Sequence, residues 1–453
     1  MSPSEIFGIF AVLLAALSFV NSRYWKLPPT IGILLGGLGI AGVVALLDAL
    51  GWPLAGQIRQ GVQTIPFGAL VFDWLLSVLL FTSAVQIDVK LLFQKRLAVV
   101  ALTLLTTLIT LLLLGAGFHT LLNLAGLPIS WAAALLFGAI AAPTDPVAAL
   151  PLLKAAKVPK TIETLLAGES LFNDGVGVVA FTVLVAVAAP GLGATSEAVT
   201  WLGTLGLFLR EMLGGILLGA VLGAAALLII RRTAKDENTR LTISVAMVVG
   251  GHAAAEWLGV SGPVTAAMSG LTLVAGLQLW RRWARKNGWL ARLSPQERGQ
   301  FQDIQNHLES FWQFVDYLLN AALFTLMAFE VLSLNLSVRL LLLAPLVILL
   351  GLMARAVGVW VPVTLLSRSE PFPRYTRRLM TWAGLRGGVT LALAFSVPDV
   401  PLRGDFLVLS YAVVVFGMVV QGLTLPQLAR RLSEAAEAQD ETKPKGQSRP
   451  EIG

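Results

Sequence analysis

The sequence predicts an all-α, polytopic membrane protein, and three observations lead to this prediction. Hydrophobic residues make up 56% of the 453 residues, charged residues only 13%, and the mean hydropathy is +0.78. A soluble domain needs a polar surface and does not sustain these values. Apolar runs that can cross a hydrocarbon core of about 30 Å recur along the chain. Finally, lysines and arginines concentrate in alternate connections between these runs.

Thirteen apolar runs are predicted to span the membrane as helices. They lie near residues 5–22, 29–50, 65–87, 97–121, 131–152, 163–189, 203–230, 241–258, 262–280, 308–331, 339–366, 377–398 and 405–429. If the N-terminus is outside, the outer loops hold only Arg59, Arg339 and Arg403, and the inner loops hold most of the 33 lysines and arginines. This asymmetry predicts a plasma or inner membrane protein with a cytoplasmic C-terminus.

Composition also excludes several classes of function. The net charge of +7 comes from basic residues dispersed over the cytoplasmic loop ends, where they contact anionic lipid, so we expect no nucleic-acid partner. The chain has no cysteine, and its three histidines form no ligand cluster, so we expect no resident metal or cofactor. No HExxH or GxSxG motif suggests an enzyme. The polar segment 430–453 is predicted to be a disordered cytoplasmic tail.

The fifth run is interrupted by Pro143, Thr144, Asp145 and Pro146. Each proline removes a backbone N–H and disfavours helix at the preceding residue, so nearby carbonyls lose their intrahelical partners. Those carbonyls, together with Thr144 and Asp145, would form an oxygen-rich pocket suited to a hard cation. The alternative is a simple proline kink, but an acid in mid-membrane costs about 2.5–3.5 kcal/mol on insertion scales and favours the functional interpretation.

The sixth run carries two further acids, Glu169 and Asp174. Helical spacing puts Ser170 and Asp174 on one face, and Glu169 and Asn173 on a neighbouring face about 100° away. One face is predicted to bind an ion, and the other to contact a structural partner.

The twelfth run contains Arg386 among Gly384, Gly387 and Gly388. An arginine cannot shed its charge, so within lipid it needs a counter-ion, and Glu169 is predicted to supply it. The alternative is that Arg386 snorkels to an interface. Two interrupted runs, the fifth and the twelfth, also indicate inverted repeats whose broken helices cross near the midplane.

Three motifs, in this order and spacing, carry a resemblance to a family: Thr144-Asp145-Pro146, Glu169 to Val179, and Gly384 to Thr390. They resemble the sodium/proton antiporters of the cation:proton antiporter superfamily, NhaP-type, in the Asn-Asp branch that includes animal sodium/hydrogen exchangers. The resemblance covers about residues 5–430. It implies a homodimer whose transport core, 97–189 with 339–429, moves like an elevator against an interface domain, 1–96 with 190–338.

Carried over by residue, the resemblance makes Asp174 the carboxylate that binds either a proton or a cation. Asp145, Ser170 and Thr144 complete the cation shell, Asn173 is the neutral member of the Asn-Asp pair, and Glu169 with Arg386 is the internal ion pair. The chain departs from the family at Thr82, where many relatives carry a glutamate in the third span. Thr82 is therefore the candidate third-span contribution.

The resemblance and the residues together predict a secondary antiporter that exchanges a monovalent cation, Na⁺ or Li⁺, for H⁺. Asp174 and Asp145 share a poorly hydrated site, so proton and cation compete for it. Because Asn173 is neutral, one proton per cation is expected, and the exchange would be electroneutral. A potassium/proton antiporter is the nearest alternative, since oxygen shells for the two ions differ mainly in size. A cation channel is a more distant one, because most spans are too apolar to line a pore.

Overall fold

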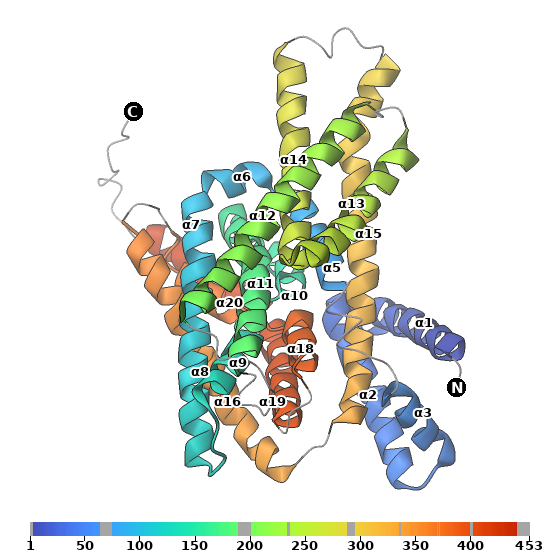
Figure 1. Ribbon diagram of the computed structural model, residues 1–453, viewed down its shortest axis with the longest axis vertical. Coiled ribbons are helices and arrows are strands. Elements are labelled where there is room, and N and C mark those ends of the chain that lie inside the picture. Colours follow the sequence, from blue (N-terminus) through green and yellow to red (C-terminus); the bar gives the residue numbers. More distant parts are fainter. Residues whose placement is uncertain are drawn as a thin grey trace.

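The computed structural model describes residues 3–63, 75–188, 201–232, 236–287, 295–334, 337–368, 370, 372–398 and 402–441. All regular secondary structure within these ranges is helical, so the predicted all-α fold is confirmed. Long helices pack side by side, and the chain passes back and forth between the two ends of the bundle (Figure 1).

Ten helical segments in the described ranges are long and apolar enough to cross a membrane. Eight contain one α-helix each: α1 (Pro3–Val20), α2 (Pro29–Ala49), α11 (Lys160–Ala188), α12 (Trp201–Arg232), α13 (Glu237–Leu258), α14 (Gly262–Lys286), α15 (Pro295–Glu330) and α16 (Val338–Leu366). The spans of α1 and α15 end in short turns of another helix type, η1 (Asn21–Trp25) and η6 (Val331–Ser333). Two are composite, with a π-helical turn inside: α7 (Arg96–Ala101), η3 (Leu102–Thr106) and α8 (Thr107–Leu124), and α19 (Arg403–Phe416), η7 (Gly417–Gln421) and α20 (Gly422–Glu441).

The other three predicted runs contain shorter helices. α5 (Leu76–Gln86) covers the second part of the run 65–87, and residues 64–74 lie outside the described residues, so the count of thirteen spans stays a prediction. The remaining two are the runs with predicted breaks. Short helices α3 (Pro53–Gln63) and α6 (Val89–Gln94), a π-helical turn η1 (Asn21–Trp25) and a 3₁₀ turn η6 (Val331–Ser333) complete the described fold.

The fifth and twelfth runs are broken helices, as predicted. The fifth consists of α9 (Trp131–Ala141) and α10 (Pro146–Ala155), and the twelfth of α17 (Thr376–Trp382) and α18 (Gly388–Phe395). The non-helical segments between them meet: the Asp145 N–H donates to the Leu385 carbonyl at 2.8 Å. This bond satisfies backbone groups that the breaks remove from the helices, which is what makes irregular backbone tolerable at membrane depth.

Two groups of helices make most of their contacts within the group, and α11 of the first group also contacts α12 and α14 of the second. In one group, α8 contacts α9 and α16, α9 contacts α11, α16 contacts α19, and α18 contacts α19. In the other, α14 contacts α5, α12 and α13, and α2 contacts α15. Figure 1 shows α8, α9, α16, α18 and α19 gathered in the lower part of the molecule, below α12, α13 and α14, with α15 running down beside them. Large apolar side chains such as Leu202, Leu217 and Leu342 are exposed on the outside, as a lipid-facing surface requires.

A close approach of two helices positions α16 in the first group. The Thr106 hydroxyl, in the π-helical turn η3, donates to the Gly358 carbonyl of α16 at 3.0 Å. A Cβ at Gly358 would lie 2.6 Å from the Thr110 hydroxyl oxygen, so glycine is what permits this contact. The π turn widens the helix locally and turns Thr106 toward α16.

The predicted disorder of 430–453 is wrong for its first part. α20 continues to Glu441, well past the end of the apolar run. Residues 430–441 are rich in Ala, Leu, Glu and Arg, which have high helix propensity, and they extend a helix that is already nucleated. Residues 442–453 lie outside the described residues.

Candidate functional site

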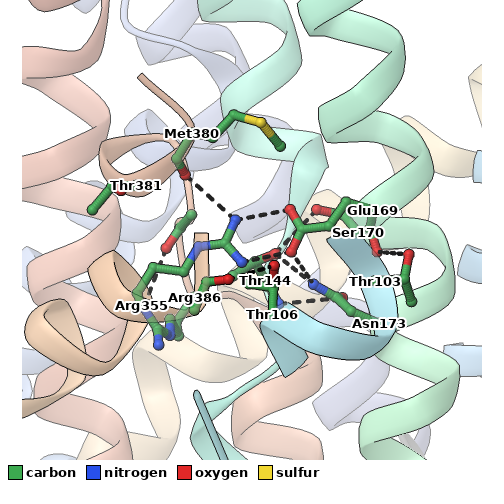
Figure 2. A network of polar contacts seen from close by, with 12 residues as sticks. Thr103, Thr106, Thr144, Glu169, Ser170, Asn173, Arg355, Met380, Thr381 and Arg386 are labelled. Carbon is green, nitrogen blue, oxygen red and sulfur yellow. Dashed lines mark hydrogen bonds and ion pairs between the residues drawn. The ribbon is translucent and has the colours of Figure 1, made fainter. Parts of the chain in front are cut away.

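The candidate site lies where the break of the fifth run meets α11. The Thr144 and Ser170 hydroxyl oxygens are 3.1 Å apart, and Asn173 Nδ2 donates to the Thr144 hydroxyl at 2.8 Å (Figure 2). All three side chains are buried. The structure thus brings together three of the residues that the sequence singled out, from two separate runs.

Asp145 follows directly on Thr144 and is 93% buried, since its exposed fraction is 7%. Its carboxylate lies against the backbone of Gly387, at a place where a Cβ on Gly387 would collide with the carboxylate oxygen Oδ2. Glycine at this position in the twelfth run therefore allows the acid of the fifth run to reach the crossing.

Asp174 is the second acid of the site, and its exposed fraction is 4%. Asp145 and Glu169 are the carboxylates close enough to act on its charge. Its Oδ1 atom is buried and has no hydrogen-bond partner among the described residues. Buried carboxylate oxygens are normally satisfied, so an unsatisfied one with a second acid nearby indicates a binding position for a proton or a cation.

Glu169 forms a bidentate ion pair, but not with the predicted partner. Arg355 of α16 donates from Nη1 to Glu169 Oε1 at 2.5 Å and from Nη2 to Oε2 at 2.8 Å (Figure 2). Asn173 Nδ2 also donates to Glu169 Oε1 at 3.2 Å, so Asn173 links the ion pair to Thr144. Both charged side chains are almost fully buried, as a bidentate Arg–carboxylate pair in low dielectric requires.

The predicted pair of Glu169 with Arg386 is therefore wrong. Arg386 lies in the extended segment of the twelfth run, where its Nε donates to the Ala141 carbonyl at 2.9 Å and its Nη1 to the Gly384 carbonyl at 3.4 Å. Ala141 ends α9, and the carbonyls at a helix C-terminus attract a cation. Arg386 is buried, not snorkelling, and it ties the two broken helices together.

Arg355 is the site residue that sequence reasoning missed. The sequence does contain a signal for it, because Arg355 is a lone arginine in the middle of a long apolar run. Hydropathy and spacing could not choose between Arg355 and Arg386 as the partner of Glu169, because the choice depends on where the fold places α16.

Thr82, the candidate third-span residue, is engaged elsewhere. Its hydroxyl is 2.7 Å from both the Leu79 carbonyl and Asp316 Oδ1 of α15. Thr82 thus faces a third intramembrane acid, Asp316, to which the sequence had assigned no role. Among the described residues, no group of three His, Cys, Asp or Glu side chains could hold a resident metal ion.

Comparisons with known proteins agree with this architecture. The sodium/hydrogen exchanger, transmembrane, family model matches residues 9–431. The Na(+)/H(+) antiporter NhaP of Pseudomonas aeruginosa is 33% identical, over 94% of this chain and 96% of its own length. The Na(+)/H(+) antiporter NhaH of Halobacillus dabanensis is 28% identical, over 94% of this chain and 97% of its own.

The fold is also that of a solved structure. The sodium proton antiporter MjNhaP1 from Methanocaldococcus jannaschii superposes with a TM-score of 0.68 and 22% identity, over 98% of this chain and 100% of that one. The extent of the family match and of the similarity to the Pseudomonas protein confirms the predicted resemblance. This chain belongs to the sodium/hydrogen exchanger family of multi-pass membrane transporters.

Proposed function

We propose that this protein is a secondary active antiporter that exchanges Na⁺ for H⁺ at Asp145 and Asp174, with Ser170 and Thr144 as further cation ligands. One observation carries the proposal: Asp174 holds a buried, unsatisfied carboxylate oxygen, with the carboxylate of Asp145 near enough to act on its charge. The relatives of this chain that are named Na(+)/H(+) antiporters support the choice of ions.

Exchange follows from competition for a single site. A proton on Asp174 removes the negative charge that a cation needs, and a bound cation opposes protonation, so the site holds one or the other. Carrying the empty, negative site through the low-dielectric interior costs about 2.5–3.5 kcal/mol or more, so reorientation is fast only in the loaded forms. This rule couples the two fluxes.

The moving part in this proposal is the transport core, 97–189 with 339–429, and the static part is the interface domain, 1–96 with 190–338. The two groups of contacting helices described above support this division. An elevator-like displacement of the core would expose the site to each side in turn. The interface domain would form a homodimer in the cell membrane, with the N-terminus outside and the C-terminus in the cytoplasm.

We propose further that the exchange is electroneutral. Asn173 is neutral and donates to both Thr144 and Glu169, and Arg355 balances the charge of Glu169. Neither Asn173 nor Glu169 then takes up or releases a proton during the cycle, and one cation replaces one proton.

The proposal is tested with the purified protein in liposomes that contain a pH-sensitive dye. We expect added Na⁺, and also Li⁺, to dissipate a preformed proton gradient at rates typical of a carrier. A response to K⁺ alone would show a potassium/proton antiporter instead. A flux far above carrier rates would show a channel.

The same liposomes test electroneutrality. When potassium and valinomycin clamp the potential at a fixed pH gradient, we expect sodium-driven proton efflux to be independent of voltage, provided that K⁺ is not itself transported. A solid-supported-membrane current proportional to flux would contradict one-for-one exchange.

The contact between Asp145 and Gly387 leads to a mutational prediction. Gly387→Ala puts a methyl group where the Asp145 carboxylate lies, so the acid must move. Misplacing a ligand by about 1 Å can cost about 10²-fold, so we expect the apparent KM for sodium to rise at least tenfold. Gly351→Ala is the matched control, because a Cβ there meets no heavy atom within 4 Å. Equal KM values in the two variants would contradict the placement of Asp145.

A further inference from the structure

A cavity of about 240 Å³ lies between the two groups of helices. The start of α2, the end of α5, α10 and α15 line it, and its lining includes Gln86, Pro146, Lys154 and Asp316. Pro146, which is part of this lining, directly follows Asp145 in the chain, so the cavity borders the segment that carries one acid of the candidate site. By the predicted topology, the start of α2 and Lys154 adjoin cytoplasmic loops, and the cavity faces the cytoplasm.

Asp316 is a half-buried acid in this lining, and two nearly inaccessible side chains hold it in place. Its Oδ1 accepts hydrogen bonds from the Thr82 hydroxyl at 2.7 Å and from Asn320 Nδ2 at 3.1 Å. The exposed fractions of Thr82 and Asn320 are 0% and 3%. Gln86, which also lines the cavity, is a third side chain that hydrogen-bonds this carboxylate. The acid is thus oriented by the protein while it borders the cavity.

A structural role does not need this charge. An asparagine at 316 could accept the same two hydrogen bonds without the cost of an intramembrane acid. Of the described residues that line the cavity, two are charged, Asp316 and Lys154. Lys154 is exposed, so salt screens it, whereas the half-buried Asp316 is screened much less. The field inside the cavity is therefore expected to favour cations.

We propose that Asp316, held by Thr82 and Asn320, forms a second, low-affinity site for monovalent cations that recruits Na⁺ into the cavity before transfer to Asp145 and Asp174. The proposal rests on the proposed antiport for its purpose, but cation selection in the cavity can be measured without transport. Thr82 has a role in this site as a positioning residue that orients the acid.

The first experiment measures the sign of the cavity's charge. The chain has no cysteine, so Ser83→Cys introduces a single thiol into the cavity lining. We expect a cationic methanethiosulfonate reagent to modify it faster than an anionic one of similar size, and NaCl to slow the cationic reagent more than choline chloride does. Adding Asp316→Asn should slow the cationic reagent and speed the anionic reagent, each about fivefold. This is the effect expected for the loss of one unit charge a few ångströms away in water.

The matched control is Glu309→Gln in the same Ser83→Cys background. Glu309 is an acid on the same helix, α15, that does not line this cavity, so both rates should stay unchanged. Lys154→Gln should increase the preference for the cationic reagent. Equal rates for the two reagents in the Ser83→Cys protein, with Asp316 intact, would overturn the proposal even if Asp316→Asn did not fold.

The second experiment measures transport from each side in inside-out and right-side-out membrane vesicles. Asp316→Asn should raise the apparent KM for sodium about fivefold on the cytoplasmic side, as expected for the loss of one nearby charge, and leave the maximal rate unchanged. An equal change on both sides, or a lower maximal rate at unchanged KM, would show a merely structural role. If the cavity selected cations but the protein exchanged no sodium, the cation site at Asp316 would be supported and the proposed antiport would be overturned.

Discussion

Asp174→Asn is expected to reduce sodium/proton exchange to the level of protein-free liposomes. The amide keeps nearly the same shape but neither titrates nor carries the charge that a cation needs, and Asp174 is the acid of the site with an unsatisfied buried oxygen. The variant should still fold, because removing a buried charge beside Asp145 and Glu169 relieves repulsion. Dye dequenching in liposomes and the thermal unfolding midpoint measure the two expectations.

The control for this variant is Asp48→Asn, the same chemical change in a surface pair with Arg59. Exposed pairs contribute about 0–1 kcal/mol, so this protein should keep its activity and its stability. If Asp174→Asn still exchanged sodium for protons at the wild-type rate, Asp174 would not be the exchanging carboxylate. If it failed to fold, its role would be structural.

The ion pair of Glu169 with Arg355 should produce the largest change in stability. Glu169→Gln or Arg355→Gln leaves one charge in a place where both partners are at most 1% exposed, so each is expected to cost about 3–5 kcal/mol. The double variant should recover much of this loss, because it leaves no unpaired charge. Thermal unfolding in detergent, analysed as a double-mutant cycle, measures the coupling.

Arg386 provides the comparison within the same experiment. Its Nε and Nη1 donate to backbone carbonyls, so Glu169→Gln and Arg386→Gln should be nearly additive, whereas Glu169→Gln and Arg355→Gln should not. Strong coupling to Arg386 with none to Arg355 would restore the pairing that the sequence suggested. Arg386→Gln alone should still destabilise the crossing, because the Ala141 carbonyl loses its donor.

Much of this architecture was readable from the sequence, because hydropathy and backbone chemistry are local. Apolar length placed the long helices, and Pro143, Pro146 and the glycines around Arg386 placed the two breaks. Helical spacing also predicted that Glu169 and Asn173 share a face of α11, and Asn173 donates to Glu169. The two faces are not separate, however, because Asn173 and Ser170 both contact Thr144. These features depend on a few neighbouring residues and on the bilayer, not on the packing of distant helices.

What could not be read depends on contacts between distant parts of the chain. The partner of Glu169 is decided by the position of α16, which Gly358 allows to lie close to η3 and α8. Asp316 had no assigned role because nothing local to α15 shows that Thr82 lies beside it. The extension of α20 to Glu441 has a different reason. The polar composition of residues 430–441 predicts disorder, but many of these residues favour helix.

The ion pair of Glu169 with Arg355 also has a consequence for membrane insertion during synthesis. Glu169 and Arg355 are 186 residues apart, which at about 5–20 residues per second means that α11 waits roughly 10–40 s for its partner to leave the ribosome. During that interval Glu169 has no arginine partner, so its carboxyl group must stay hydrated or be protonated. We therefore expect α11 to be stably inserted only after α16 has been synthesised. A nascent chain that stalls before Arg355 would present the unpaired Glu169 to membrane quality control, whereas in the finished protein this acid is paired and buried.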